Sequence, residues 1–139
     1  MSEAIDLARG WLAKGDSDLF SARLIATSSG PYDTACFHAQ QAAEKYLKGL
    51  LAFAGQPVPL THNLEELERY CATLNPAPDF TGLDLTQLTP YAVQLRYDPG
   101  FWPDQATAVE ALALAERVRT AVLAVLPQAA HPQRTNAFM

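Results

Sequence analysis

Four polar side chains recur along one stretch of the sequence, CFHAQQAAEKYLKGLL at residues 36–51. His38, Gln41, Lys45 and Lys48 follow one another at steps of three, four and three, so on a helix they fall within about 80° of one another. Imidazole and amide groups form directional hydrogen bonds and lysine adds a point charge, a combination that suits a phosphate-bearing ligand. The same residue types also occur on ordinary solvated helix faces. The spacing alone leaves both interpretations open.

A second candidate is LRYDPGFW at residues 95–102, where Arg96 ends an expected helix and Tyr97 and Asp98 open a turn-rich loop. An arginine at a helix C-terminus interacts favourably with the helix dipole, which is a purely structural explanation. The Phe-Trp pair that follows is either an apolar anchor for the loop or part of a partner surface, where Trp, Tyr and Arg are favoured.

Other chemical motifs are absent from the sequence. It contains no Walker loop, GxGxxG, HExxH, CxxC or GxSxG pattern. Because these motifs are absent, we expect no metal, no cofactor and no catalytic residue. Cys36 and Cys71 lack metal-type spacing and are expected to be reduced thiols. His62 is expected to cap or pack, and His131 to lie inert near the C-terminus.

The composition fits a single globular domain. Of the 139 residues, 49% are apolar and 18% are charged, and the net charge is -5. A pI near 5.0 argues against broad, sequence-independent binding to nucleic acid, although a local basic patch remains compatible with it. The first residues, MSEAIDLARGW, do not form a signal peptide, and no apolar run is long enough for a membrane span. We therefore expect a cytoplasmic protein.

The hydrophobic periodicity predicts helices throughout. Long helices are expected over residues 4–27, 32–54 and 104–126, a shorter one over 64–74, and an irregular one over 83–96. Asn63 with Glu66 three residues on, and Asp104, are the expected N-caps, and Pro90 should break the irregular helix with Thr89 as its cap. The pattern predicts an all-α, largely antiparallel up-and-down bundle of four or five helices. We expect one domain at residues 1–126, followed by a flexible tail at 127–139.

Three blocks in this order, CFHAQQAAEKYLKGLL, THNLEEL and LTPYAVQLRYDPGFWP, resemble the HEPN domain (higher eukaryotes and prokaryotes nucleotide-binding). WLAKGDSDLFSARLI resembles the first helix of that family, so the resemblance spans about residues 5–126. It implies an antiparallel bundle of four to five helices and a homodimer. Stand-alone members are often encoded beside a minimal nucleotidyltransferase, which implies a toxin–antitoxin-like pair with such a protein.

Many HEPN domains are metal-independent ribonucleases, and their signature is an Arg followed, after four to six residues, by a His that takes part in proton transfer. The positions at this spacing after Arg96 are Phe101, Trp102 and Pro103, and the other arginines also lack a His there. Arg96 and Tyr97 match the Arg-Tyr of a branch of the family that is not nuclease-like. The resemblance therefore implies a binding module without the usual ribonuclease motif.

The nucleotide- or RNA-binding groove that the resemblance implies would be lined by His38, Gln41, Lys45, Lys48, Arg96, Tyr97 and Asp98. Two alternatives stay open. The first is a ribonuclease toxin with a non-standard site that uses His38 and Arg96. The second is a purely structural helical scaffold for some other partner.

Overall fold

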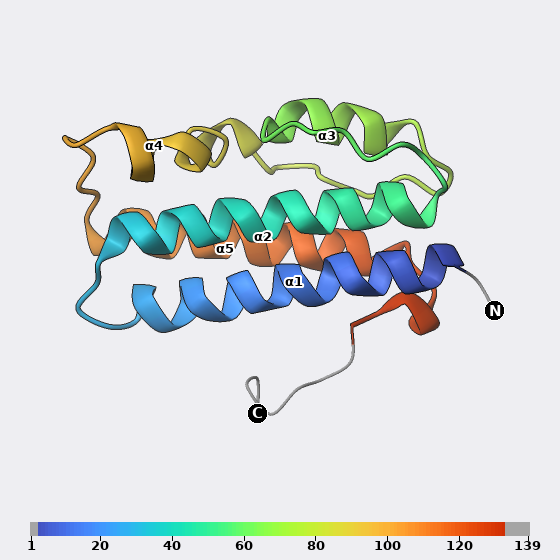
Figure 1. Cartoon of the computed structure of the whole chain (residues 1–139), viewed down its shortest axis with the longest axis horizontal. Coiled ribbons are helices and arrows are strands. Elements are labelled where there is room, and N and C mark those ends of the chain that lie inside the picture. The colour runs from blue at the N-terminus through green and yellow to red at the C-terminus, as the bar shows by residue number, and fades with distance from the viewer. Residues whose placement is uncertain (1–2, 133–139) are drawn as a thin grey trace.

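The computed structural model describes residues 3–132, and helices dominate this range (Figure 1). The elements in chain order are α1 (Glu3–Ala26), α2 (Tyr32–Phe53), α3 (Leu64–Ala72), the short 3-10 helix η1 (Leu85–Gln87), α4 (Tyr91–Tyr97), α5 (Gln105–Ala124) and the short 3-10 helix η2 (Gln128–Ala130). No β-strand occurs within residues 3–132. The prediction of an all-α bundle of four or five helices is confirmed.

Helix α2 lies at the centre of the bundle and packs against α1, α3, α4 and α5 (Figure 1). Of its 22 residues, 15 are buried, so α2 is a core helix and has no broad solvated face. Small residues let α1 and α2 approach closely: a Cβ at Gly15 would lie only 2.7 Å from the ring of the fully buried Tyr46. Because α2 is enclosed on most sides, its polar residues need partners inside the protein.

The helices do not all alternate in direction. The pairs α1–α2 and α1–α5 are antiparallel, whereas α3 runs the same way as α2 (Figure 1). The segment 54–63 first returns along α2, which brings His62, at the start of α3, beside Glu44. Further along α3, the thiol of Cys71 donates to the carbonyl of Leu47. This return places the 61–63 segment over one face of α2.

Two of the predicted helix caps are confirmed and one is wrong. The side chain of Asn63 accepts from the amide of Glu66 at 2.8 Å, and that of Asp104 accepts from the amide of Thr107 at 2.9 Å. Thr89 does not cap α4, whose N-cap is Pro90 without a side-chain bond. Its hydroxyl instead accepts from the amide of Leu64 at 3.1 Å, and so serves the start of α3.

The described part of the expected tail is packed against the bundle. Residues 127–132 include η2, in which Ala130 is fully buried, and the Ala129 carbonyl accepts a hydrogen bond from Arg9 of α1. Nε2 of His131 lies 3.1 Å from the carbonyl of Leu123, so this histidine takes part in holding the segment. The expectation of a tail from residue 127 is therefore wrong up to Pro132, and residues 133–139 lie outside the described residues.

Candidate functional site

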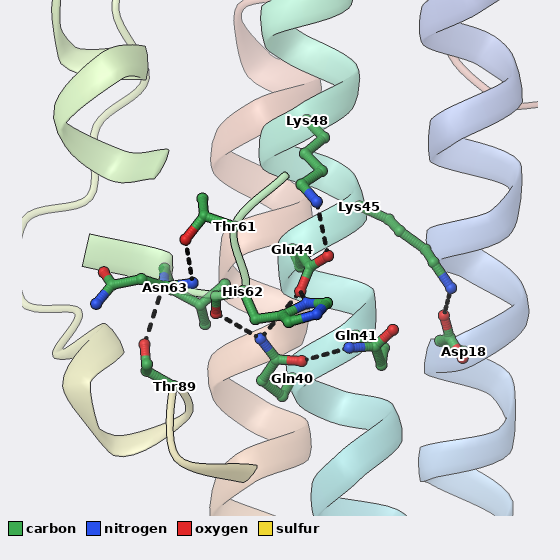
Figure 2. Close-up of polar contacts among 11 residues, drawn as sticks. Asp18, Gln40, Gln41, Glu44, Lys45, Lys48, Thr61, His62, Asn63 and Thr89 are labelled. Atoms are coloured by element: carbon green, nitrogen blue, oxygen red, sulfur yellow. Dashed lines mark hydrogen bonds and ion pairs between the residues drawn. The ribbon is translucent and has the colours of Figure 1, made fainter. Parts of the chain in front are cut away.

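The polar stripe on α2 divides into a buried part and a half-exposed part. The buried part centres on the carboxylate of Glu44 (Figure 2). Its Oε2 accepts from Lys48 Nζ at 2.9 Å, and its Oε1 lies 2.9 Å from His62 Nδ1 and accepts from Gln40 Nε2 at 3.3 Å. Gln40 also donates to the carbonyl of His62 at 3.0 Å. We call Gln40, Glu44, Lys48 and His62 the Glu44 network.

The Glu44 network holds the 61–63 segment against α2. As a result, Lys48 is an internal ion-pair partner and does not face solvent. Lys48 is 5% exposed, because the returning segment and Trp11 cover it, and its ammonium lies 5.9 Å from the Trp11 ring centroid. The expectation that Lys48 faces a ligand is therefore wrong: its charge is already neutralised inside the protein. The side chain of His62 is 63% exposed, so this histidine acts through its polar contacts with Glu44 and Gln40 and not through packing.

The half-exposed part of the stripe joins α2 to α1 through Asp18. His38 Nδ1 lies 2.8 Å from Asp18 Oδ1. Lys45 donates to the other oxygen of the same carboxylate (Figure 2). Burial alone would raise the pKa of Asp18, but the hydrogen bonds and charges of His38 and Lys45 outweigh it and hold the pKa below its ordinary value of 3.8. Gln41 donates to the Gln40 side chain at 2.7 Å. These contacts hold three side chains in place and form a partly accessible surface of His38, Gln41 and Lys45.

Arg96 lies close to this surface, at the end of α4. Its guanidinium carbon is 5.6 Å from the centroid of the Phe37 ring, and that ring is 5.6 Å from the ring of His38. Arg96 is exposed, and within residues 3–132 no carboxylate forms an ion pair with it. The structure therefore brings Arg96 to the same end of the bundle as His38.

The loop after Arg96 presents aromatic side chains to solvent. Tyr97 and Trp102 are each 74% exposed. The indole N–H of Trp102 donates to the Pro99 carbonyl at 3.0 Å, and Asp98 accepts from the amide of Gly100 at 2.9 Å, so the loop is internally ordered. Asp98 is thereby a turn residue. Phe101 differs from Trp102: it packs against the core beside Tyr91, with ring centroids 5.5 Å apart.

Two residues of this region could not be found from the sequence. Asp18 is separated from its partners by 20 and 27 residues, and Gln40 is indistinguishable in sequence from the other polar residues of the stripe.

No group of three or more potential metal ligands occurs in the described part of the chain. Burial raises the pKa of Cys36 and of Cys71 to about 12, so both thiols stay protonated near neutral pH. Among residues 3–132, no helix is both long and apolar enough to cross a bilayer.

Comparison with known proteins relates the chain to one family. The family model of the HEPN domain matches residues 8–125. The crystal structure of TT1696 from Thermus thermophilus is similar, with 31% identity and a TM-score of 0.68 over 86% of this chain and 98% of that one. ST0689, an archaeal HEPN homologue, shows 28% identity and a TM-score of 0.59 over 89% and 98% of the two chains. No protein of curated function matches. The chain belongs to the HEPN domain family.

Proposed function

We propose that this protein is a dimeric nucleotide- or RNA-binding module that pairs with a minimal nucleotidyltransferase and does not cleave RNA efficiently. The binding proposal rests on the exposure of Arg96 and on its lack of an ion-pair partner among the described residues. Arg96 is an exposed arginine that lacks a carboxylate partner within residues 3–132, and its guanidinium lies over the Phe37 ring, which also contacts the His38 ring. A guanidinium can bind phosphate through two parallel hydrogen bonds, and Arg96 is available to do so.

The surroundings of Arg96 supply the other contacts that a nucleotide needs. Tyr97 and Trp102 can stack on a base, an interaction worth about 1–3 kcal/mol per base and tolerant of sequence. Lys45 adds a second charge once a phosphate competes with Asp18 for it. We therefore place the binding surface on His38, Gln41, Lys45, Arg96 and the 97–102 loop.

Binding can be followed through tryptophan fluorescence. Stacking of a base on the exposed indole of Trp102 should quench its emission, and the second tryptophan, Trp11, is half-buried on α1 and serves as an internal reference. Titration with ATP and with a short single-stranded RNA should quench the wild-type protein and leave Trp102→Phe unquenched. Equal quenching of both proteins would place the ligand elsewhere.

The purified protein should have twice the 15.1 kDa mass of one chain at micromolar concentration. Apart from Tyr97 and Trp102, which belong to the proposed binding surface, the exposed large apolar residues within the described range are Leu7, Leu24, Leu60, Tyr70, Val93 and Val109. Burial of such side chains across a two-fold axis is the commonest way to cover them. Light scattering measures the mass, and a monomer mass would contradict the proposed dimer.

Co-purification with the product of an adjacent nucleotidyltransferase gene tests whether the two proteins form a complex.

A metal-independent ribonuclease remains the second candidate, because His38 is held by Asp18 as a positioned base would be, with Arg96 nearby. We nevertheless expect no efficient RNA cleavage, since the chain lacks a His at the family's spacing after any Arg. The assay incubates labelled RNA with the protein in chelator and compares wild type with His38→Ala. Rapid cleavage that survives chelator and disappears in His38→Ala would establish the ribonuclease.

A further inference from the structure

A second polar region lies on the side of α1 that faces α5. Two clefts meet there and share Arg119 and Pro132 in their walls; one has a volume of about 320 Å³ and the other about 610 Å³. Both volumes fall in the range of small-molecule sites. Neither cleft includes a residue of the surface around Arg96, and we call the two together the α1–α5 cleft.

The α1–α5 cleft concentrates positive charge in an acidic chain. Three of the seven arginines of the sequence line it: Arg9, Arg23 and Arg119. Two of them are already paired, Arg23 with Glu116 at 2.7 Å and Arg119 with Asp16 at 2.7 and 3.2 Å. Asp16 is further satisfied by the hydroxyl of Tyr46 at 2.6 Å. Among the cleft residues that the structure describes, only Arg9 has a charge that no carboxylate at residues 3–132 compensates.

Arg9 also carries an unsatisfied donor. One of its terminal nitrogens donates to the Ala129 carbonyl of η2, but its Nε is buried without a hydrogen-bond partner in the described part of the chain. A buried N–H without an acceptor is costly and rare, and it commonly marks the place of a water or an ion. Arg9 has no carboxylate partner within residues 3–132 either.

The remaining wall residues suit an anion. His131 Nε2 lies 3.1 and 3.2 Å from the carbonyls of Leu123 and Leu126, so this ring donates to the backbone and holds the wall in place. Gln128 adds an amide that donates or accepts. The guanidinium of Arg9 matches the oxygens of a phosphate group, whereas Arg119 adds positive charge but already donates from Nε and one terminal nitrogen to Asp16. Asp16 and Glu116 do not oppose the anion strongly because each is already paired with an arginine.

We propose that the α1–α5 cleft binds a small phosphate-bearing ligand, with Arg9 as its principal contact and Arg119 beside it. This site is separate from the surface around Arg96 and does not depend on the function proposed for that surface. The shared chemistry is the phosphate group, which free phosphate or a nucleotide can supply. The residues Arg9 and Arg119 lie on different helices, so a ligand bound between them also ties α1 to α5 and η2.

The test uses inorganic phosphate, pyrophosphate and AMP as probes on the full chain labelled with ¹⁵N. Each active probe should shift the Nε–H resonance of Arg9, which reports the donor that lacks an acceptor. Arg9→Gln should weaken binding at least about tenfold, as loss of a charged hydrogen bond predicts. Arg9→Lys, which keeps the charge and loses the fork, should weaken it less. A stronger response to AMP than to phosphate would identify the source as a nucleotide.

Two control variants keep this proposal separable from the one for Arg96. Lys14→Gln removes a charge from the same helix outside the cleft and should bind as wild type does. In Arg96→Ala, inorganic phosphate and pyrophosphate should still shift the Nε–H resonance of Arg9 as they do in wild type, whereas AMP can also bind the surface around Arg96. The proposal fails if no probe moves the Arg9 resonance at millimolar concentration, which would mean a buried water only. It also fails if Arg96→Ala abolishes binding while Arg9→Gln does not, an outcome that would support the Arg96 surface instead.

Discussion

Replacement of Glu44 by alanine should destabilise the protein by about 3–5 kcal/mol. The variant leaves the ammonium of Lys48 buried, with 7% of its side chain exposed, and without the carboxylate that neutralises it. It also removes the carboxylate that contacts His62 and Gln40, so the 61–63 segment keeps only the bond from Gln40 to the His62 carbonyl as its attachment within this network. Chemical denaturation monitored by circular dichroism measures the change in the free energy of unfolding.

Two matched variants show that burial causes this effect. Glu116→Ala removes the carboxylate of the Arg23–Glu116 pair, whose side chains are 45% and 41% exposed, and should cost at most about 1 kcal/mol. The double variant Glu44→Leu/Lys48→Met replaces the buried pair by apolar side chains and should recover most of the lost stability. A loss in Glu44→Ala no larger than that in Glu116→Ala would contradict the proposed structural role of the Glu44 network.

Arg96→Ala should lower the affinity for single-stranded RNA by roughly tenfold or more. Loss of a charged hydrogen bond to phosphate costs about 1.5–3 kcal/mol, and each 1.4 kcal/mol is a factor of ten. Stability should change by only about 0.5–1 kcal/mol, since the contact with the Phe37 ring is an exposed cation–π interaction. Fluorescence anisotropy of labelled RNA measures the affinity, and wild-type binding should weaken as salt rises.

The matched control for this variant is Arg69→Ala. Arg69 is an exposed arginine in the last turn of α3, so its replacement changes the net charge equally at a different place. RNA affinity should stay within about twofold of wild type in this control, because exposed charges far from the site act only weakly through salt-screened fields. Equal losses in both variants would indicate general electrostatic attraction, and unfolding of Arg96→Ala would make Arg96 a structural residue.

Features that depend on neighbouring residues can be predicted from the sequence. The two long helices α1 and α2 follow from hydrophobic periodicity. The caps Asn63 and Asp104 are predictable because each side chain accepts from the backbone amide three residues further along the chain. The prediction for Thr89 is wrong because its partner, the Leu64 amide, lies 25 residues away in sequence. Local patterns carry no information about such a contact.

The composition of the candidate site can be predicted from the sequence, but its burial cannot. The 3.6-residue period places His38, Lys45 and Lys48 on one arc, yet it does not show that the 54–63 segment returns over Lys48 and leaves the other two accessible. Asp18 escapes prediction for the same reason, since its role arises only when α1 packs against α2. Arg96 can be named from the sequence, but its position over the Phe37 ring depends on where α4 packs against α2.

We propose that the surface around Arg96 binds nucleic acid, and locating a bound RNA by NMR tests this proposal directly. Amide resonances of the ¹⁵N-labelled protein would be recorded during titration with a short single-stranded RNA at low salt. We expect the largest shifts at residues 37–45 of α2 and at residues 96–102, which comprise the end of α4 and the loop that follows it. No shift, or shifts confined to the α1–α5 cleft near Arg9, would contradict it.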